Sequence, residues 1–100
     1  MNPNVLNLLG LAMRSRNVIL GEKEIMKAMQ NSTGKIVFLA SDAGSNIVKK
    51  IHNKATTYHH IIIDDFDSNK ISKAIGKTHR KAAIVLDKGF NDAIKKYLNS

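Results

Sequence analysis

Residues 35–40 read Lys-Ile-Val-Phe-Leu-Ala, and the apolar run within them follows a polar turn sequence, Asn31-Ser32-Thr33-Gly34. A continuous apolar run of this length is typical of a strand that is covered on both faces of its sheet. A second run of the same kind, Ala-Ala-Ile-Val-Leu, occupies residues 82–86. Two such strands need helices on both sides of one sheet, and they therefore decide the fold class.

The segments around these two strands alternate between helical and extended patterns. Apolar residues recur at three- and four-residue spacing, which predicts helices over residues 4–14, 22–31, 44–54, 68–75 and 90–98. Shorter apolar runs predict strands at residues 18–20 and 58–63. We therefore expect a three-layer α/β/α sandwich of the α/β class, with a four-stranded mixed sheet. No linker, repeat or low-complexity segment interrupts the pattern, so residues 1–100 are expected to form a single domain.

The charge balance of the chain points to the kind of partner it binds. Sixteen Lys and Arg residues against eight Asp and Glu residues give a formal net charge of +8 and a pI of about 9.9. The excess is even in the two halves of the chain, so any electropositive face has to be assembled by folding rather than by a basic tail. A charge of this size predicts a polyanionic partner.

The composition excludes several function classes. The chain has no cysteine, which rules out disulfides, a thiolate nucleophile and a Cys-ligated zinc site. Its longest apolar run is about five residues, far below the roughly 20 that a membrane span needs. Residues 1–4, Met-Asn-Pro-Asn, lack the charged region of a secretory signal. We therefore expect a cytoplasmic protein with no membrane partner.

The residue types that carry catalysis do not form a known catalytic or metal-binding motif. No glycine-rich nucleotide loop, zinc-protease motif or nucleophile elbow is present. His52, His59 and His60 lack metal-ligand spacing and are expected at the surface or at the edge of the sheet. The acidic stretch 64–67 either ends a strand and caps the next helix, or holds a cation. We expect no metal, no cofactor and no enzymatic activity.

A first basic cluster lies where the second predicted helix begins. Gly21 allows a ligand to approach the backbone, and the free N–H groups of a helix N-terminus suit phosphate oxygens. Lys23 and Lys27 are four residues apart and share one helix face, with Glu22 and Glu24 beside them. The carboxylate of Glu24 is an acceptor for hydrogen bonds from base edges. Alternatively, the glutamates only complement the helix dipole and the lysines form a solvated face.

A second basic cluster lies in the predicted loop between the fourth helix and the last long strand. It consists of Gly76, Lys77, Thr78, His79, Arg80 and Lys81. The guanidinium of Arg80 is able to contact a phosphate or a guanine through two parallel hydrogen bonds. Loops on a rigid scaffold are common sites of binding, and we expect Lys77 and Arg80 to be exposed, as we do Lys27. The alternative is a solvated connector.

The few aromatic residues indicate which kind of nucleic acid suits this chain. Only five are present, and Phe38, Phe90 and Tyr97 fall at positions expected in the core. This distribution argues against a base-stacking platform for single strands. If RNA binds, it is expected to be structured RNA, recognised by shape, phosphates and a few base edges.

Several short motifs, in this order and spacing, resemble a known family over nearly the full chain. The sequence is similar to the kink-turn RNA-binding ribosomal proteins of the L-seven-Ae and L-thirty-e type, and most closely to their bacterial YlxQ branch. The motifs are Leu8-Leu9-Gly10-Leu11-Ala12, Gly21-x-x-Glu24-x-x-Lys27-Ala28, Lys35-Ile36-Val37-Phe38-Leu39-Ala40-x-Asp42-Ala43, Ile71-x-x-Ala74-Ile75-Gly76, Gly76-Lys77-x-x-Arg80-Lys81 and Asp87-x-Gly89-Phe90.

The resemblance implies a three-layer fold that binds an internal bend in duplex RNA. In such proteins the start of the second helix enters the widened groove at sheared G·A pairs, and the loop before the last main strand covers an extruded nucleotide. Gly21, Glu24 and Lys27 match the helix motif, and residues 76–81 occupy the loop. The resemblance therefore places the two basic clusters on one edge. Many kink-turn binders have Asn before the Glu, where this chain has Lys23.

Two function classes follow from these observations. The first is a non-catalytic, ribosome-associated RNA-binding protein, with structured ribosomal RNA as the partner of a monomer and ribosomal proteins as further partners. Its affinity is expected to come largely from phosphate contacts. The alternative is a protein-interaction module that uses a basic face of the same fold against an acidic protein surface.

Overall fold

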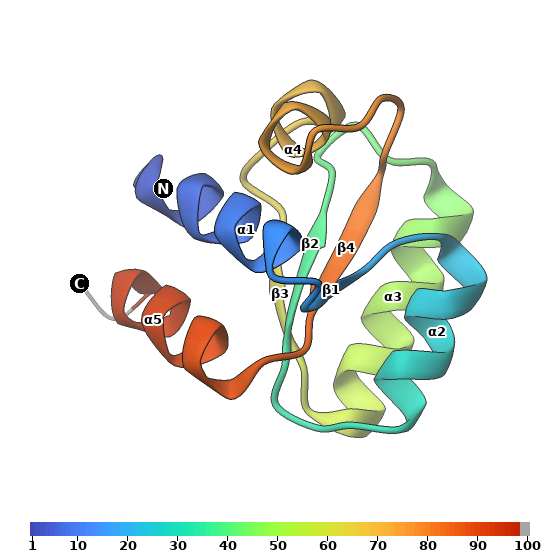
Figure 1. Cartoon of the computed structure of the whole chain (residues 1–100). Helices are drawn as coiled ribbons and strands as arrows, with labels where there is room; N and C mark the ends of the chain where they lie inside the picture. The colour runs from blue at the N-terminus through green and yellow to red at the C-terminus, as the bar shows by residue number, and fades with distance from the viewer. Residues whose placement is uncertain (99–100) are drawn as a thin grey trace.

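Helices and strands alternate along residues 1–98, the part of the chain that the computed structural model describes. Their bounds are α1 (Asn4–Arg14), β1 (Val18–Ile19), α2 (Glu22–Gln30), β2 (Ile36–Leu39), α3 (Ser45–Tyr58), β3 (Ile61–Ile63), α4 (Ser68–Ile75), β4 (Ala82–Val85) and α5 (Lys88–Leu98). A four-stranded mixed sheet lies between two helical layers (Figure 1), so the expected three-layer α/β/α sandwich is confirmed.

The sheet has the strand order β1-β4-β2-β3. β2 and β3 are parallel, with Ile36 opposite Ile61, whereas β4 runs antiparallel to both β1 and β2. The two long apolar runs, in β2 and β4, therefore occupy the centre of the sheet. Every residue of these two strands is buried, as expected for strands that are covered on both faces.

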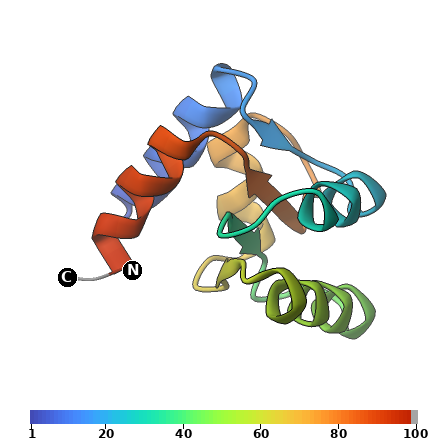
Figure 2. The same cartoon turned by 90° about the horizontal axis from the view of Figure 1, so that it is seen from below.

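Alternate side chains of β2 contribute to two separate cores. Ile36 and Phe38 pack with the layer formed by α1, α4 and α5, while Val37 and Leu39 pack with the layer formed by α2 and α3. This division follows from the two-residue period of a strand, which turns successive side chains to opposite faces. Figures 1 and 2 show the two helical layers on opposite sides of the sheet.

The boundary between α3 and β3 differs from the sequence prediction. The predicted strand over 58–63 is wrong at its start, because α3 continues to Tyr58 and β3 begins only at Ile61. His59 ends the helix in the left-handed conformation, with φ of 62°.

The longer α3 has an identifiable physical cause. The hydroxyls of Thr56 and Thr57 donate to the carbonyl oxygens of His52 and Asn53, each at 3.0 Å, so these β-branched residues are satisfied inside a helix. Ala55 is buried in the core under α3, which holds this last part of the helix on the sheet. Tertiary packing therefore overrides the extended preference of the local sequence.

His60 directly precedes β3, an edge strand of the sheet, as one of the predicted alternatives has it, and it is a buried structural residue and not a surface one. Its Nδ1 accepts a hydrogen bond from the backbone N–H of Lys35 at 3.1 Å, and its Nε2 lies 2.8 Å from the carbonyl oxygen of Met29. The ring therefore ties the end of α2 to the start of β2, since both nitrogens have backbone partners. Only 8% of the residue is exposed.

The predicted start and end of α4, at residues 68 and 75, are confirmed. The carboxylate of Asp67 accepts the backbone N–H of Lys70 at 2.9 Å and so caps the start of the helix. Gly76 ends it with φ of 70°, a left-handed conformation that favours glycine. None of the helices within residues 1–98 has the length and apolar character to cross a bilayer.

Candidate nucleic-acid interface

The two basic clusters predicted from the sequence lie side by side in the fold. A surface hollow of about 220 Å³ is lined by Gly21 and Glu22 at the start of α2 and by His79, Arg80 and Lys81 of the loop before β4. In Figure 1 the loop before β4 lies at the top and the start of α2 at the right-hand side of the molecule. We call this surface, formed by residues 21–27 and 76–81, the α2–loop edge.

The start of α2 leaves its backbone open to a ligand. Gly21 occupies the N-cap position with φ of 89°, and no side chain caps the helix. A side chain at Gly21 would meet no atom within 4 Å, so the backbone angle, not lack of space, selects glycine here. Its carbonyl accepts the N–H of Ile25 at 2.8 Å, which begins the helix and directs the earlier N–H groups outward.

The charged side chains of α2 are exposed and carry both signs. Glu22, Lys23, Glu24 and Lys27 all lie at the surface. The carboxylate of Glu22 lies 4.0 Å from the ammonium of Lys50 on α3, a weak surface ion pair. Of these four residues, only Glu22 lines the hollow, so the structure places the other three beside it along the helix.

The basic loop is held in shape by hydrogen bonds from a buried serine that the sequence analysis missed. Ser72 of α4 accepts the N–H of Arg80 on its hydroxyl at 2.8 Å and the N–H of Lys77 on its carbonyl at 2.9 Å. Ser72 is only 5% exposed, so these bonds are shielded from water. Between them, His79 adopts φ of 55°. The loop backbone is therefore held in one conformation, which fixes the positions from which its side chains extend.

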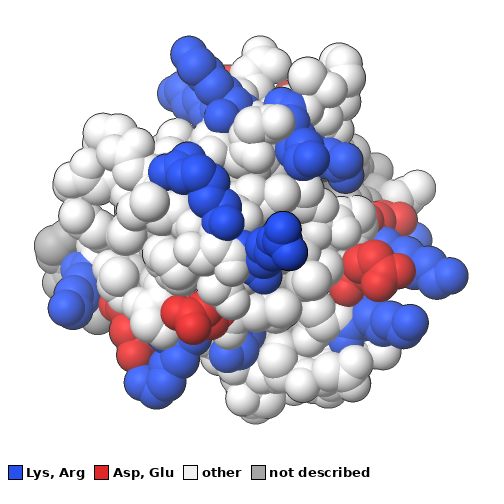
Figure 3. Space-filling view, viewed as in Figure 1, with Lys and Arg blue, Asp and Glu red and all other residues white. Residues whose placement is uncertain are grey.

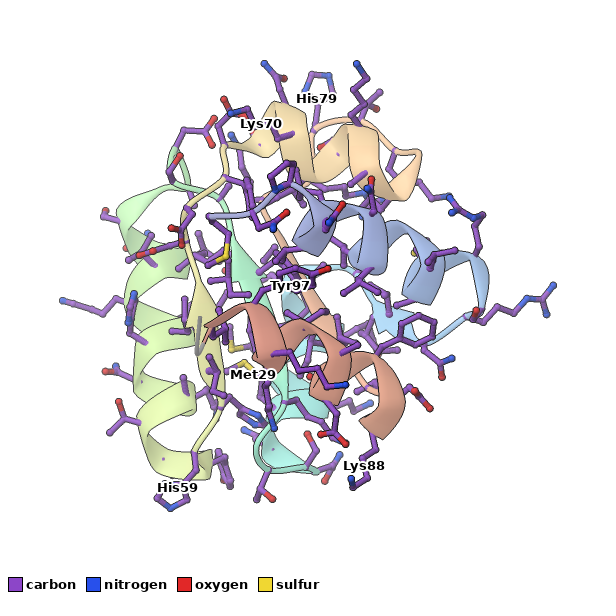
Figure 4. The ribbon with its side chains drawn as sticks, turned by 90° about the vertical axis from the view of Figure 1, so that its left-hand side faces the viewer. Met29, His59, Lys70, His79, Lys88 and Tyr97 are labelled. Carbon is purple, nitrogen blue, oxygen red and sulfur yellow. The ribbon has the colours of Figure 1, made fainter. Side chains whose placement is uncertain are left out.

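The side chains of the loop differ in how far they reach into solvent. Lys77, Thr78 and His79 are exposed, as is Lys81, and this agrees with the expectation for Lys77. Arg80 is half-buried and not exposed as the sequence predicts, because its backbone is tied to α4 and it forms part of the wall of the hollow. Figure 4 shows His79 at the same end of the molecule as Lys70, opposite His59 and Lys88.

Lys81 is partnered by an acidic residue outside both predicted clusters. Its ammonium lies 3.5 Å from the carboxylate of Asp42 and 3.4 Å from the hydroxyl of Ser68. The Ser68 hydroxyl and backbone N–H both donate to Asp42, at 2.7 and 2.8 Å. The hydroxyl bond first, then the N–H bond and the charge of Lys81, lower the pKa of Asp42 to about 2. Lys81 is therefore less available to a ligand than the other loop cations.

Two apolar residues complete the hollow and were not predicted. Ile47, near the start of α3, and Ala82, the first residue of β4, lie in its wall beside Ile25. They come from segments with no charge pattern, so only the three-dimensional arrangement reveals them. The cations of the site are therefore visible in the sequence, whereas these two residues of its apolar wall are not.

No described segment offers a metal site at this edge or elsewhere. Within residues 1–98, no group of three or more His, Asp or Glu side chains is placed to hold a metal ion. Of the acidic stretch 64–67, Asp67 serves as the cap of α4, in agreement with the structural alternative given for that stretch. The chemistry of the α2–loop edge is that of cations, backbone N–H groups and two carboxylates around a small hollow.

The three-layer fold and the basic α2–loop edge are those of a nucleic-acid-binding type of domain, and comparison with known proteins identifies the family. The model of the ribosomal protein L7Ae/L30e/S12e/Gadd45 family matches residues 4–95, and the chain belongs to this family. It is 37% identical over 93 residues to the RNA-binding protein YlxQ of Enterococcus faecium, which covers 93% of this chain and 89% of that protein. The YlxQ protein of Bacillus subtilis (strain 168) is 38% identical over 84 residues, or 83% of each chain.

More distant relatives and solved structures agree with this assignment. The large ribosomal subunit protein eL30 of Tetrahymena thermophila is 31% identical over 92% of this chain and 90% of its own. A structure of a protein with unknown function from Bacillus halodurans C superposes with a TM-score of 0.90 at 33% identity, covering 99% of this chain and 100% of that one. The Giardia lamblia 15.5kD RNA binding protein shares the fold, with a TM-score of 0.72 at 16% identity over 94% and 81%. The family resemblance seen in the sequence is confirmed.

Proposed function

We propose that this chain is a non-catalytic, ribosome-associated RNA-binding protein that recognises structured, kink-turn-like RNA through the α2–loop edge. Residues 1–100 would act as one cytoplasmic domain, a monomer with ribosomal RNA as its main partner and ribosomal proteins as neighbours. The residues assigned to RNA are Gly21, Glu22, Lys23, Glu24, Lys27, Gly76, Lys77, Thr78, His79, Arg80 and Lys81.

One structural observation carries the proposal. Residues about 60 positions apart in the chain, at Gly21 and at His79 to Lys81, line the same hollow. A helix N-terminus alone is a weak anion site, but here it faces a basic loop that is fixed by Ser72. The α2–loop edge combines open backbone N–H groups and cations for phosphates with the carboxylate of Glu24 for base edges, which is the division between positioning and specifying contacts.

The relatives support the coarser part of the proposal. The family is one of ribosomal proteins, and two relatives that align with most of this chain are named RNA-binding proteins. These findings support RNA as the partner of this chain and agree with a protein that is not an enzyme. The kink-turn, the residues and the ribosomal association belong to the proposal.

Glu24 provides the test that separates a reader of RNA structure from a general polyanion binder. A carboxylate repels phosphates, so on a purely electrostatic surface Glu24→Gln would strengthen RNA binding. If Glu24 accepts hydrogen bonds from guanine edges, the variant loses about 1–2 kcal/mol, or roughly five- to thirtyfold in Kd, on a kink-turn. We expect this loss by fluorescence titration of a labelled kink-turn, with a matched straight duplex unaffected or bound slightly more tightly.

Lys23→Asn is the matched companion variant, since it restores the residue common in the resembling kink-turn binders. It removes one cation, so it is expected to weaken binding to both RNAs while raising the ratio of kink-turn to duplex affinity. Tighter binding of Glu24→Gln to both RNAs would reject specific readout by this residue. An unchanged ratio with Lys23→Asn would reject kink-turn recognition at the start of α2.

A further inference from the structure

A second surface hollow lies between α1 and α4, in the helical layer on the other side of the sheet from α2. Its volume is about 510 Å³, and it shares no lining residue with the α2–loop edge. Leu6, Gly10, Leu11 and Ala74 form an apolar floor. Leu11 is 45% exposed, and besides Met1 it is the only large apolar side chain so exposed within residues 1–98. We call this surface the α1–α4 groove.

The floor of the groove is formed by a close approach of the two helices. A Cβ atom on Gly10 would come within 2.7 Å of the carbonyl oxygen of Ala74, so only glycine permits this contact between α1 and α4. Gly10 and Ala74 form the floor of the groove together with the side chains of Leu6 and Leu11. The groove is thus part of the packing of the fold and is present before any partner binds.

The rim of the groove is basic. Arg14 at the end of α1 and Lys70 and Lys73 on α4 line it, and no acidic residue does. Neither α1 nor α4 contains an Asp or Glu anywhere in its sequence. None of the three cations forms an ion pair with another described residue. In Figure 3, Lys and Arg side chains gather over α4 and the adjoining α1, whereas the larger groups of Asp and Glu lie at the right-hand and lower left edges.

We propose that the α1–α4 groove is a docking site for an acidic amphipathic helix of a partner protein. A helix laid between α1 and α4 presents one apolar stripe to the floor, in the helix-in-groove mode of recognition. Glutamates and aspartates flanking that stripe meet Arg14, Lys70 and Lys73, which gives charge complementarity without any acid in the groove to oppose it. A contiguous apolar surface with a polar rim is one mark of a protein-interaction site.

The apolar floor distinguishes this groove from a surface for RNA. Phosphates interact with cations and with backbone N–H groups and gain nothing from Leu11, whereas the leucines of a partner helix bury it. RNA bases stack mostly on aromatic side chains, and the groove has none in its lining; Arg14 is its one guanidinium. The proposal does not depend on the function proposed for the α2–loop edge. A partner helix in the groove leaves that edge free, so RNA and protein would be held at once.

An acidic helical peptide tests the proposal on the full chain. The probe is a fluorescent peptide of about 15 residues, roughly four turns, with Leu at three- and four-residue spacing and Glu on both flanks of that stripe. A scrambled peptide of the same composition controls for charge alone. We expect saturable binding with a Kd below about 1 mM. Amide NMR shifts are expected at Leu11, Lys73 and Ala74 and not at residues 76–81 or at the start of α2.

Two variants at exposed positions identify the contacts without disturbing the fold. Leu11→Ser removes the apolar anchor and is expected to weaken peptide binding about tenfold. Lys73→Glu reverses one rim charge and is expected to weaken it about fivefold. Lys96→Glu, at an exposed lysine of α5, is the charge-matched control and is expected to change Kd less than twofold. Amide spectra of the free variants verify that each is folded.

Three results would overturn the proposal. The first is an absence of saturable binding, and the second is equal binding of the scrambled peptide. The third is that a kink-turn or a duplex RNA shifts the amides of the α1–α4 groove and displaces the peptide from it. In that case the groove belongs to an RNA surface, whichever RNA the α2–loop edge recognises.

Discussion

The α2–loop edge and the α1–α4 groove are both basic, yet they differ in what lies between their charges. At the α2–loop edge the cations surround helix N–H groups and stand beside Glu22 and Glu24, and Lys81 is paired with Asp42. In the α1–α4 groove the cations surround leucine and glycine, and no acid is among the residues that line it. The first surface has polar groups of both signs, and the second has one sign of charge over an apolar floor.

The difference shows that net charge indicates only that the ligand is acidic. The groups that lie between the charges determine which acidic ligand each surface binds. A formal charge of +8 predicts an acidic partner for the whole chain. Carboxylates at an otherwise basic edge oppose phosphate binding unless they accept specific hydrogen bonds, so they suit a ligand with base edges. An apolar floor rewards a ligand with apolar side chains of its own. The two surfaces therefore suit different polyanions.

Salt separates the two surfaces most strongly. If the α2–loop edge neutralises about four to six phosphates, log K falls with log salt at a slope of roughly −3.5 to −5.5, or about a hundred- to two-thousandfold between 50 and 200 mM. Binding of the acidic peptide is expected to fall much less, since part of its affinity comes from buried apolar area. Titrations of both ligands over this salt range measure the two slopes. A slope flatter than about −1 with every RNA tried would contradict the electrostatic account.

Single cations at the α2–loop edge give the next largest effect. Lys27→Ala, Lys77→Ala and Arg80→Ala are each expected to weaken RNA binding about three- to tenfold, through loss of a phosphate contact. The same variants are expected to bind the acidic peptide as the unmodified chain does. Because Arg80 is half-buried, its variant also needs a thermal unfolding measurement to separate lost contact from lost stability.

Lys95→Ala and Lys96→Ala on α5 are the charge-matched controls for these three variants. Both lie outside the hollow of the α2–loop edge and outside the α1–α4 groove. Lys96 is the cleaner of the two because it is exposed, whereas Lys95 is half-buried. Equal losses of RNA affinity at all five positions would mean that the chain acts as a diffuse cation, and the contrast between the two surfaces would disappear.

Much of the fold can be predicted from the sequence because short-range patterns of apolar residues determine most of its helices and strands. The runs 36–40 and 82–86 predict the two central strands, and three- and four-residue spacing predicts every helix of the chain. The failure at the start of 58–63 has a clear cause, since α3 continues to Tyr58 with Ala55 buried on the sheet and the hydroxyls of Thr56 and Thr57 hydrogen-bonded inside the helix. The burial of His60 is not predicted, because its backbone partners are set by tertiary structure.

The cations of the candidate site can be predicted from the sequence, whereas the residues that hold or line the site cannot. Both basic clusters are visible in the sequence, and the family resemblance places them on one edge, as the shared hollow now shows. Ser72 and Ile47 carry no signal of their own, and Asp42 belongs to a family motif that does not say which lysine it pairs with. Their role depends on which loop or lysine lies next to them, and that depends on the packing of α3, α4 and β4.

The smallest expected effect is a change in stability when the ion pair of Lys81 with Asp42 is removed. This pairing is one difference between the α2–loop edge and the groove, whose rim cations have no ion pair within residues 1–98. Asp42 has a pKa of about 2 in the folded chain, against 3.8 for an ordinary Asp, chiefly because the Ser68 hydroxyl donates to it. A lowered pKa means that the folded state holds the carboxylate more strongly ionised than the unfolded state does. Its contribution to stability is therefore complete above pH 3.8, and it is lost as the pH falls toward 2.

Asp42→Asn is accordingly expected to lower Tm at pH 6, and its difference in Tm from the unmodified chain is expected to shrink as the pH falls through 2, where Asp42 takes up a proton in the folded state. Thermal unfolding by circular dichroism across this pH range measures the difference. Ser68→Ala removes only the hydroxyl donor, and it should lower Tm less in the Asp42→Asn background than in the unmodified chain, because a hydrogen bond to a neutral amide oxygen is weaker than one to a carboxylate. Asp64→Asn, at an exposed carboxylate with no hydrogen bond to any of residues 1–98, is the control and is expected to leave Tm nearly constant. A Tm difference for Asp42→Asn that persists unchanged at pH 2 would show that the charge of Asp42, and with it the pairing of Lys81, is not what stabilises this part of the edge.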